Sequence, residues 1–155
     1  MPSVMGGSHW KYLKELEEIK GDKWQESEEE QKTWCDDYIK KSYYIWTDIR
    51  FMDQIVGFLI TGVKPDCHPS CDYFICQSYV LPEYRNKGLM TDAVNKFVKL
   101  HLGRYCMIIL KNNNYAKKFW DNRFEDLGYS RMKLLDIGCL RKDEEQYGYE
   151  QQDKR

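Results

Sequence analysis

A short basic segment, residues 80–90, is the part of this sequence best suited to bind a ligand. A predicted strand ends at Pro82, which cannot donate a ladder hydrogen bond, and an amphipathic helix begins at Gly88. The first N–H groups of a helix lack intrahelical partners and carry partial positive charge, to which Arg85 and Lys87 add full charges. Gly88 has no Cβ, so a ligand can approach the backbone closely. These features predict a seat for an anion such as a pyrophosphate, and an ordinary strand-to-helix turn is the alternative.

The spacing of Arg85, Gly88 and Met90 resembles the Q/R-x-x-G-x-G/A signature of the GNAT superfamily of N-acetyltransferases, which also directly follows a strand. Met90 departs from the small residue at the last position of that signature. A second segment resembles the N-x-x-A-x-x-F-Y pattern of the same family. Its matching residues are Asn113, Ala116, Phe119 and Trp120. Together the two segments extend the resemblance over about residues 43–135.

The resemblance implies an α+β (mixed α/β) fold with a central, mostly antiparallel sheet that splays at its middle strands and is flanked by helices. It also implies an enzyme that uses acetyl-CoA as co-substrate, with an acceptor amine attacking the thioester directly. Backbone N–H groups of residues 86–91 would hold the pyrophosphate, and residues 78–80 would contact the pantetheine. The cofactor-binding residues that it implies are Ser78, Tyr79, Val80, Arg85, Asn86, Lys87, Gly88, Leu89, Met90, Thr91 and Asn113.

Such a reaction needs a base for the acceptor and an acid for the departing thiolate. An alkylammonium has a pKa near ~10.4, so exposing its lone pair at neutral pH costs about 4.6 kcal/mol. Glu83 is the base that we predict, and Asp72 is a weaker candidate. The family often uses the tyrosine of its second motif as the acid, but this chain has Trp120 there, whose indole N–H is no proton-transfer acid near neutrality. We predict Tyr115 as the substitute, with water as the alternative, and interpret Trp120 as a core residue.

The cysteines suggest two other chemistries. Cys76, inside a predicted strand, could act as a nucleophile in a ping-pong route, but a small buried hydrophobe is the favoured interpretation. Cys67, His68 and Cys71 resemble part of a metal clip, but a structural zinc needs four ligands and no second pair follows. We therefore predict no metal site.

Hydrophobic periodicity predicts the elements that would position these residues. Two helices within residues 10–40 precede three meandering strands, a helix, a strand, a helix and a last strand. The predicted strands are 43–50, 54–62, 73–81, 105–110 and 129–139. The helices between them begin near Met90 and Asn113, and end before Gly103 and Gly128. This order contains one strand-helix-strand unit in its second half and is typical of an α+β protein.

The 155 residues fit one domain, which we predict over residues 1–142, followed by a polar, flexible tail at 143–155. The net charge of -1 argues against a protein that coats nucleic acid through bulk charge. No apolar stretch approaches the ~20 residues of a membrane helix, and no signal pattern begins the chain, so we predict a cytoplasmic protein without membrane contact.

Charge is unevenly distributed along the chain. Residues 81–120 are basic, as suits the polyanion CoA, and residues 1–40 are acidic. The acidic segment favours a cationic acceptor such as an aminoglycoside-like antibiotic, a polyamine, a lysine side chain or an N-terminal amine, although a solvated acidic helix start is equally consistent. The sequence leaves a homodimer open. The alternative function is an acyl-CoA-binding regulatory module without catalysis, and an RNA-binding protein is a weaker one.

Overall fold

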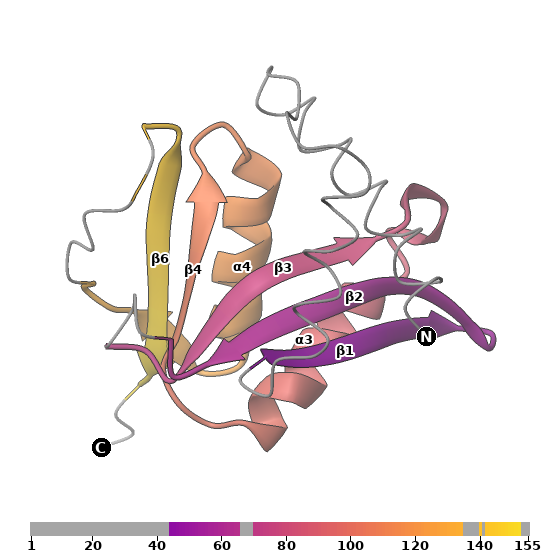
Figure 1. Ribbon diagram of the computed structural model, residues 1–155, viewed down its shortest axis with the longest axis horizontal. Helices are drawn as coiled ribbons and strands as arrows, with labels where there is room; N and C mark the ends of the chain where they lie inside the picture. Colours follow the sequence, from indigo (N-terminus) through magenta and orange to yellow (C-terminus); the bar gives the residue numbers. More distant parts are fainter. Residues whose placement is uncertain (1–43, 66–69, 135–139, 141, 153–155) are drawn as a thin grey trace.

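Six strands form a mostly antiparallel sheet in the order β1-β2-β3-β4-β6-β5 (Figure 1). The computed structural model describes residues 44–65, 70–134, 140 and 142–152. The strands are β1 (Tyr44–Phe51), β2 (Gln54–Val63), β3 (Tyr73–Val80), β4 (Tyr105–Leu110), β5 (Tyr129–Arg131) and β6 (Glu144–Gln151). The helices in these ranges are α3 (Leu89–Leu100) and α4 (Asn114–Asp126), and a 3-10 turn, η1, spans Pro82–Tyr84. The α+β fold is therefore confirmed, whereas the two helices expected within residues 10–40 lie outside the described residues.

Strands β1, β2 and β3 form the predicted meander. Met52 and Asp53 connect β1 to β2 and have φ angles of 50° and 66°. Two consecutive left-handed residues are typical of the tight turns that join antiparallel strands. The strand bounds agree with those predicted from the runs of β-branched and aromatic residues to within one residue.

Strands β3 and β4 pair for only a short distance before they separate. Their parallel register joins Tyr73 to Tyr105, Phe74 to Cys106 and Ile75 to Met107, and stops there. On the other side of β3, Thr61 pairs with Ile75 and Ile60 pairs with Gln77, which leaves Cys76 as the extra residue of a β-bulge. Because a bulge bends and twists its strand, it directs the end of β3 away from β4 (Figure 1).

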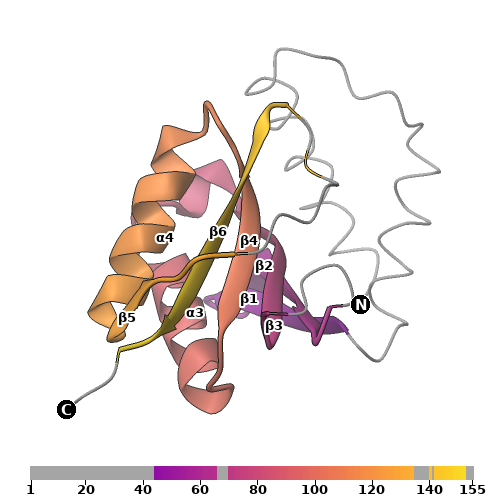
Figure 2. The same cartoon turned by 90° about the vertical axis from the view of Figure 1, so that its left-hand side faces the viewer.

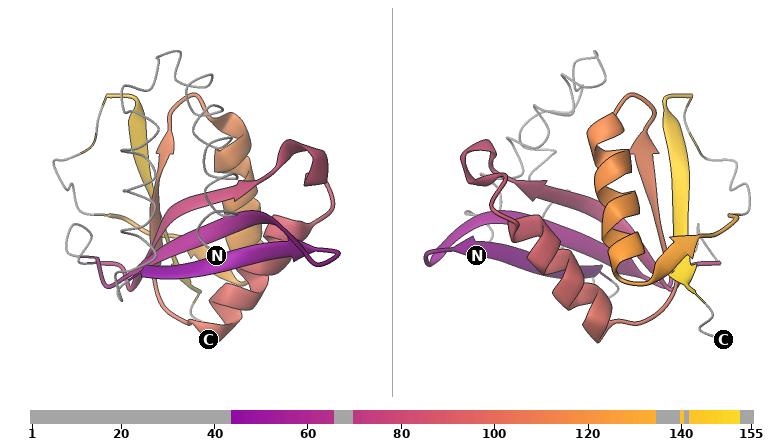
Figure 3. Two further views of the ribbon diagram at one scale, coloured as in Figure 1. Left: turned by 45° about the vertical axis from the view of Figure 1, so that its right-hand side comes forward. Right: turned by 180° about the vertical axis from the view of Figure 1, so that it is seen from behind.

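Helices α3 and α4 cover the same face of the sheet (Figures 2 and 3). The side chains of β4 point alternately toward the helices and away from them, because successive side chains of a strand point to opposite faces of a sheet. Tyr105, Met107 and Ile109 belong to the main core cluster with Val94, Phe97, Trp120 and Phe124 of the helices. The intervening residues, Cys106, Ile108 and Leu110, therefore face the opposite side. Neither helix of the described ranges is long and apolar enough to cross a membrane.

The structure of residues 144–151 corrects one prediction. A flexible tail at 143–155 was expected, but residues 144–151 form β6, which lies between β4 and β5 and pairs with both. Tyr147 and Tyr149 are 7% and 2% exposed, and they anchor the strand in the core. The prediction failed because only these two apolar side chains mark the strand among six polar and glycine residues. The last predicted strand, 129–139, is confirmed only for Tyr129–Arg131.

Candidate functional site

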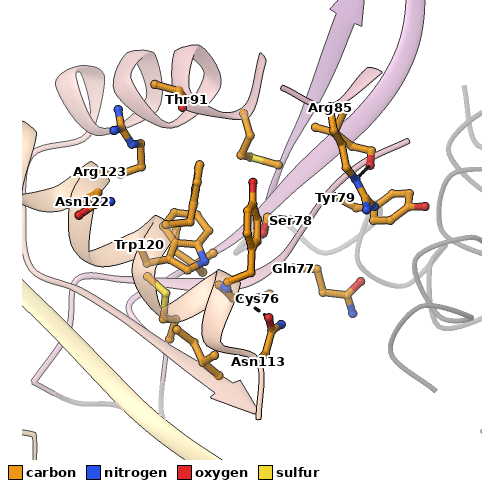
Figure 4. Close-up of a pocket in the computed structure, with 18 of the residues that line it drawn as sticks. Cys76, Gln77, Ser78, Tyr79, Arg85, Thr91, Asn113, Trp120, Asn122 and Arg123 are labelled. Atoms are coloured by element: carbon orange, nitrogen blue, oxygen red, sulfur yellow. Dashed lines mark hydrogen bonds between the residues drawn. The ribbon is translucent and has the colours of Figure 1, made fainter. Parts of the chain in front are cut away.

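A cavity of about 1050 Å³ lies where β3 and β4 separate (Figure 4). Its wall consists of β3, the loop after it, the first turn of α3, the end of β4 and one face of α4. A volume of this size accommodates a drug-sized or nucleotide-sized molecule. The turn in which the sequence predicts an anion-binding site therefore forms part of the cavity wall.

The first turn of α3 presents unpaired backbone donors to this cavity. Gly88 precedes the helix with φ 76° and ψ 13°, and no described side chain caps the N-terminus. The first intrahelical bond runs from Asp92 N to Gly88 O at 3.0 Å. The N–H groups of Leu89, Met90 and Thr91 precede that bond and so have no intrahelical partner. A Cβ built at Gly88 would meet nothing within 4 Å, so open space lies beside these donors.

Two arginines on different elements line the cavity. The Nε atom of Arg85 donates to the carbonyl of Val80 at 2.8 Å, and its guanidinium carbon lies 5.1 Å from the centre of the Tyr79 ring. These contacts tie the basic loop to the end of β3. Arg123 of α4 pairs with Asp126 at 2.9 Å and is 21% exposed, and Figure 4 shows it on the same side of the cavity as Thr91. The two guanidinium groups therefore lie at separate parts of the cavity wall, Arg85 beside Tyr79 and Arg123 on α4.

The sequence did not single out Arg123, although a signal for it existed. Arg123 follows Ala116 by seven residues, so the two lie on the same face of an α-helix. Ala116 belongs to the second family motif and lines the cavity. The helical period alone would therefore have placed Arg123 in the site.

The structure brings most of the predicted site residues together. Those that line the cavity are Ser78, Tyr79, Val80, Arg85, Asn86, Gly88, Leu89, Met90, Thr91, Asn113 and Tyr115. Lys87 and Glu83 are not among them: the Lys87 ammonium lies 5.5 Å from the centre of the Phe51 ring, and Glu83 is exposed on η1. Asp72 accepts from Arg104 N at 2.7 Å, beyond the paired end of β3.

The structure shows the contacts of three residues that occupy positions of the two family motifs. Asn113 caps α4, because its side-chain oxygen accepts from Ala116 N at 3.2 Å. Trp120 is 4% exposed and belongs to the main core cluster, as its interpretation as a core residue requires. Met90 packs against two core clusters as well as lining the cavity, so its long side chain is accommodated without blocking the open space at Gly88.

Cys76 lines the cavity beside the bulge, but its thiol is not activated. Burial raises the pKa of this thiol to about 12, although a hydrogen bond with the backbone of Gly62 partly offsets the rise. A thiol with so high a pKa is almost entirely protonated at neutral pH, and the thiolate is the nucleophilic form. The surroundings of Cys76 thus disfavour the ping-pong route. The other expectation about the cysteines was that Cys67, His68 and Cys71 form no metal site. Cys67 and His68 lie outside the described residues, so this stays a prediction.

We expect Cys76→Ala to retain any acyl transfer within about threefold of the parent rate, because a protonated thiol contributes no nucleophile. Intact mass measured after incubation with acetyl-CoA and no amine should show the unmodified chain. A thermal melt checks that the variant folds. Stoichiometric acetylation that disappears in Cys76→Ala would contradict this expectation.

The cavity also has a wall that the sequence did not predict. It is formed on the side of the sheet away from the helices by Gln77, Ile108, Leu110 and Glu144. Leu110 pairs with Glu144 across β4 and β6, so both side chains point to that face. Glu144 lay in the supposed tail, and Gln77 depends on the bulge at Cys76, so neither had a local signal.

The sequence model described as the acetyltransferase (GNAT) family matches residues 10–124, which is most of the chain. No curated protein sequence is significantly similar. Among solved structures, an acetyltransferase from Thermus thermophilus is similar at 16% identity with a TM-score of 0.66, over 95% of this chain and 86% of that one.

Two further structures contain CoA. The diaminobutyrate acetyltransferase of Paenibacillus lautus, in complex with L-2,4-diaminobutyric acid and coenzyme A, has 14% identity and a TM-score of 0.61 over 94% of this chain and 88% of its own. The PaiA N-acetyltransferase of Thermoplasma acidophilum, in complex with coenzyme A, has 13% identity and a TM-score of 0.52 over 97% and 90%. At these identities the likeness shows the fold.

Proposed function

Because the chain belongs to the acetyltransferase (GNAT) family, we propose that it transfers the acetyl group of acetyl-CoA to a cationic amine, and that the cavity between β3 and β4 holds both substrates. The observation that carries this proposal is the uncapped N-terminus of α3, which opens onto the cavity at a left-handed glycine. A helix N-terminus with open space beside it binds phosphate groups well. The residues present therefore fit a CoA molecule.

Different parts of the site would hold different parts of the cofactor. The N–H groups of residues 89–91 and the guanidinium of Arg85 would bind the pyrophosphate. Backbone groups of residues 78–80 would contact the pantetheine, since the ladder between β3 and β4 ends at Ile75. When bound, acetyl-CoA supplies an acetyl thioester.

The chain itself supplies a shaped site and hydrogen-bond donors for the transfer. On the side toward β4, backbone N–H groups of β3 beyond Ile75 have no strand partner, so they can donate to a developing oxyanion. Tyr115, 75% exposed at the cavity wall, stays the predicted acid, with water as its alternative. Glu83 stays a predicted base, although a carboxylate outside the cavity must act through water.

The nature of the acceptor also belongs to this proposal. The Paenibacillus lautus enzyme was crystallised with a diamino acid, which supports a small cationic amine. The cytoplasmic location and the homodimer considered from the sequence remain parts of the proposal.

A second candidate is an acyl-CoA-binding regulatory module with this fold and no catalysis. The buried indole of Trp120 at the family's tyrosine position favours it, because the indole N–H does not transfer protons near neutrality.

Calorimetric titration with CoA, followed by thiol-release assays with acetyl-CoA and a panel of amines, tests both candidates. The proposal expects CoA binding and amine-dependent thiol release. CoA binding without release from any amine favours the regulatory module. Absence of binding at millimolar CoA would refute both.

A further inference from the structure

Cys71 and Cys106 form a pair of neighbouring thiols outside the cavity. Cys71 lies just before β3, at the end of the sheet where β3 pairs with β4, and Cys106 is in the first turn of pairing on β4. Their side chains hydrogen-bond to each other. Both residues are buried, at 4% and 0% exposure, and neither lines the cavity. The proposed transferase site therefore makes no use of this pair.

Backbone hydrogen bonds hold the segments that carry the two cysteines against each other. The N–H groups of Asp72 and Tyr73 both donate to the carbonyl of Arg104, at 2.9 and 3.0 Å. In return, the N–H of Arg104 donates to the Asp72 carboxylate at 2.7 Å. Each of these residues is next to, or next but one to, Cys71 or Cys106 in the chain. The backbone of the sheet therefore sets the contact between the thiols.

The two thiols differ in acidity. The hydrogen bond with Cys106 is the largest cause that lowers the pKa of the Cys71 thiol, against burial, which raises it. A hydrogen bond with Ser70 and the positive charge of Arg104 lower the pKa of Cys71 further. The pKa of Cys106 is raised by the same thiol–thiol hydrogen bond and by burial. Cys71 therefore ionises first, and the thiolate is the nucleophilic form of a cysteine.

Cys76 is a third thiol of the same region, but its hydrogen bond lies elsewhere. Its Sγ atom donates to the carbonyl of Phe74 at 3.6 Å, and burial raises its pKa to about 12. Cys76 therefore serves as an internal control for the pair.

Solvent lies close to Cys71 although the residue itself is buried. Its neighbour Ser70 is partly exposed, and the side chain of Asp72 is 39% exposed. The end of a strand also opens locally more easily than the centre of a sheet. A hydroperoxide is small enough to enter through such an opening, so it can reach the Cys71 sulfur.

We propose that Cys71 and Cys106 are a redox-reactive pair that forms a disulfide when the chain meets a hydroperoxide. In the first step the Cys71 sulfur attacks a peroxide oxygen, the O–O bond breaks, and Cys71 becomes a sulfenic acid while the other oxygen leaves as water or an alcohol. In the second step the Cys106 sulfur attacks the Cys71 sulfur, and the S–O bond breaks. The sulfenic oxygen leaves as water with the Cys106 proton. The two thiols thus lose two electrons and two protons, which reduce one peroxide.

The test treats the folded, reduced parent chain with hydrogen peroxide and then blocks the remaining thiols with iodoacetamide under denaturing conditions. Trypsin places Cys71 in peptide 51–85 and Cys106 in peptide 105–111. We expect mass spectrometry to find these two peptides joined, at a mass two hydrogens below the sum of the reduced peptides. Absence of the joined peptides would overturn the inference.

Peptide 51–85 also contains Cys67 and Cys76, so the partner of Cys106 must be identified. A chain with both Cys67→Ala and Cys76→Ala keeps one cysteine in each peptide and should form the same link. Fragment spectra of the joined parent peptides give the same answer without a variant. A bond from Cys106 to Cys67 or Cys76 in these spectra would overturn the inference.

Two single variants test which thiol reacts first. In Cys106→Ala the sulfenic acid has no partner thiol, so dimedone, which traps sulfenic acids, should label Cys71. In Cys71→Ala we expect dimedone to label Cys106 at least about tenfold more slowly, because its thiol is buried and protonated. Thermal melts show that both variants are folded. Equal labelling of the two cysteines would overturn the assigned order, and the link in the parent chain is measured independently of both variants.

Discussion

Replacing Gly88 with valine should weaken CoA binding by about a hundredfold or more, which corresponds to about 2.7 kcal/mol. Two effects of the substitution act together. The φ angle of 76° at this position is left-handed, which is especially unfavourable for a β-branched residue. In addition, the new side chain would project into the open space beside the N–H groups of residues 89–91, where the pyrophosphate is proposed to bind.

Gly128 offers a matched control for this experiment. It also has a left-handed φ, 84°, and a Cβ there would also meet nothing within 4 Å. It follows the end of α4 and does not line the cavity. Gly128→Val should therefore reproduce the backbone strain without affecting the ligand.

Calorimetric titration with CoA and thermal melts of both variants complete the comparison. We expect both melting temperatures to fall and only the Gly88 variant to lose CoA affinity. Equal losses of affinity in the two variants would mean that backbone strain, and not occupation of the anion seat, explains the result. Parent-like affinity in Gly88→Val would refute the seat itself.

The cofactor side of the cavity could be predicted because its signals are local. Pro82 ends β3, Gly88 begins α3 and Asn113 caps α4, and each acts through its own backbone or through residues a few positions away. The apolar run at residues 105–110 likewise predicted the bounds of β4. Short-range rules therefore sufficed to place the residues of one wall.

The opposite wall could not be predicted because it depends on contacts that are distant in sequence. Gln77 reaches the cavity through a bulge that appears only in its pairing with β2. Glu144 reaches it because β6 lies beside β4, more than 30 residues earlier in the chain. The polar sequence of β6 gave no indication that two tyrosines bury its middle. Glu83, by contrast, is close to the anion seat in sequence but is exposed on η1 and does not line the cavity.

A chain truncated after residue 142 should fail to fold, although the sequence suggested that its end is dispensable. Strand β6 lies inside the sheet, where six of its residues pair with β4 and three with β5. Its removal would expose the edge of β4 and leave β5 without its partner in the described sheet. Exposed apolar strand edges promote aggregation, so we also expect low solubility.

The side chains of β6 make the loss of stability on its removal larger than the loss expected for a peripheral strand. Tyr149 is 2% exposed, and its ring stacks on that of Phe124 with centroids 4.4 Å apart and planes 10° apart. Its hydroxyl donates to Asp121 at 2.7 Å, and Arg131 of β5 donates to the same carboxylate at 2.7 and 2.9 Å. One aromatic residue of β6 thus connects α4, β5 and the core.

Far-UV circular dichroism and thermal melting of three chains distinguish β6 from the residues that follow it. The chain ending at residue 142 should show no cooperative transition, whereas a chain ending at Gln152 should melt like the parent, because β6 is intact. Tyr149→Ala should lie between them, with a loss of about 3–5 kcal/mol from a total stability of only about 5–15 kcal/mol. A cooperative melt of the shortest chain would contradict the central place of β6.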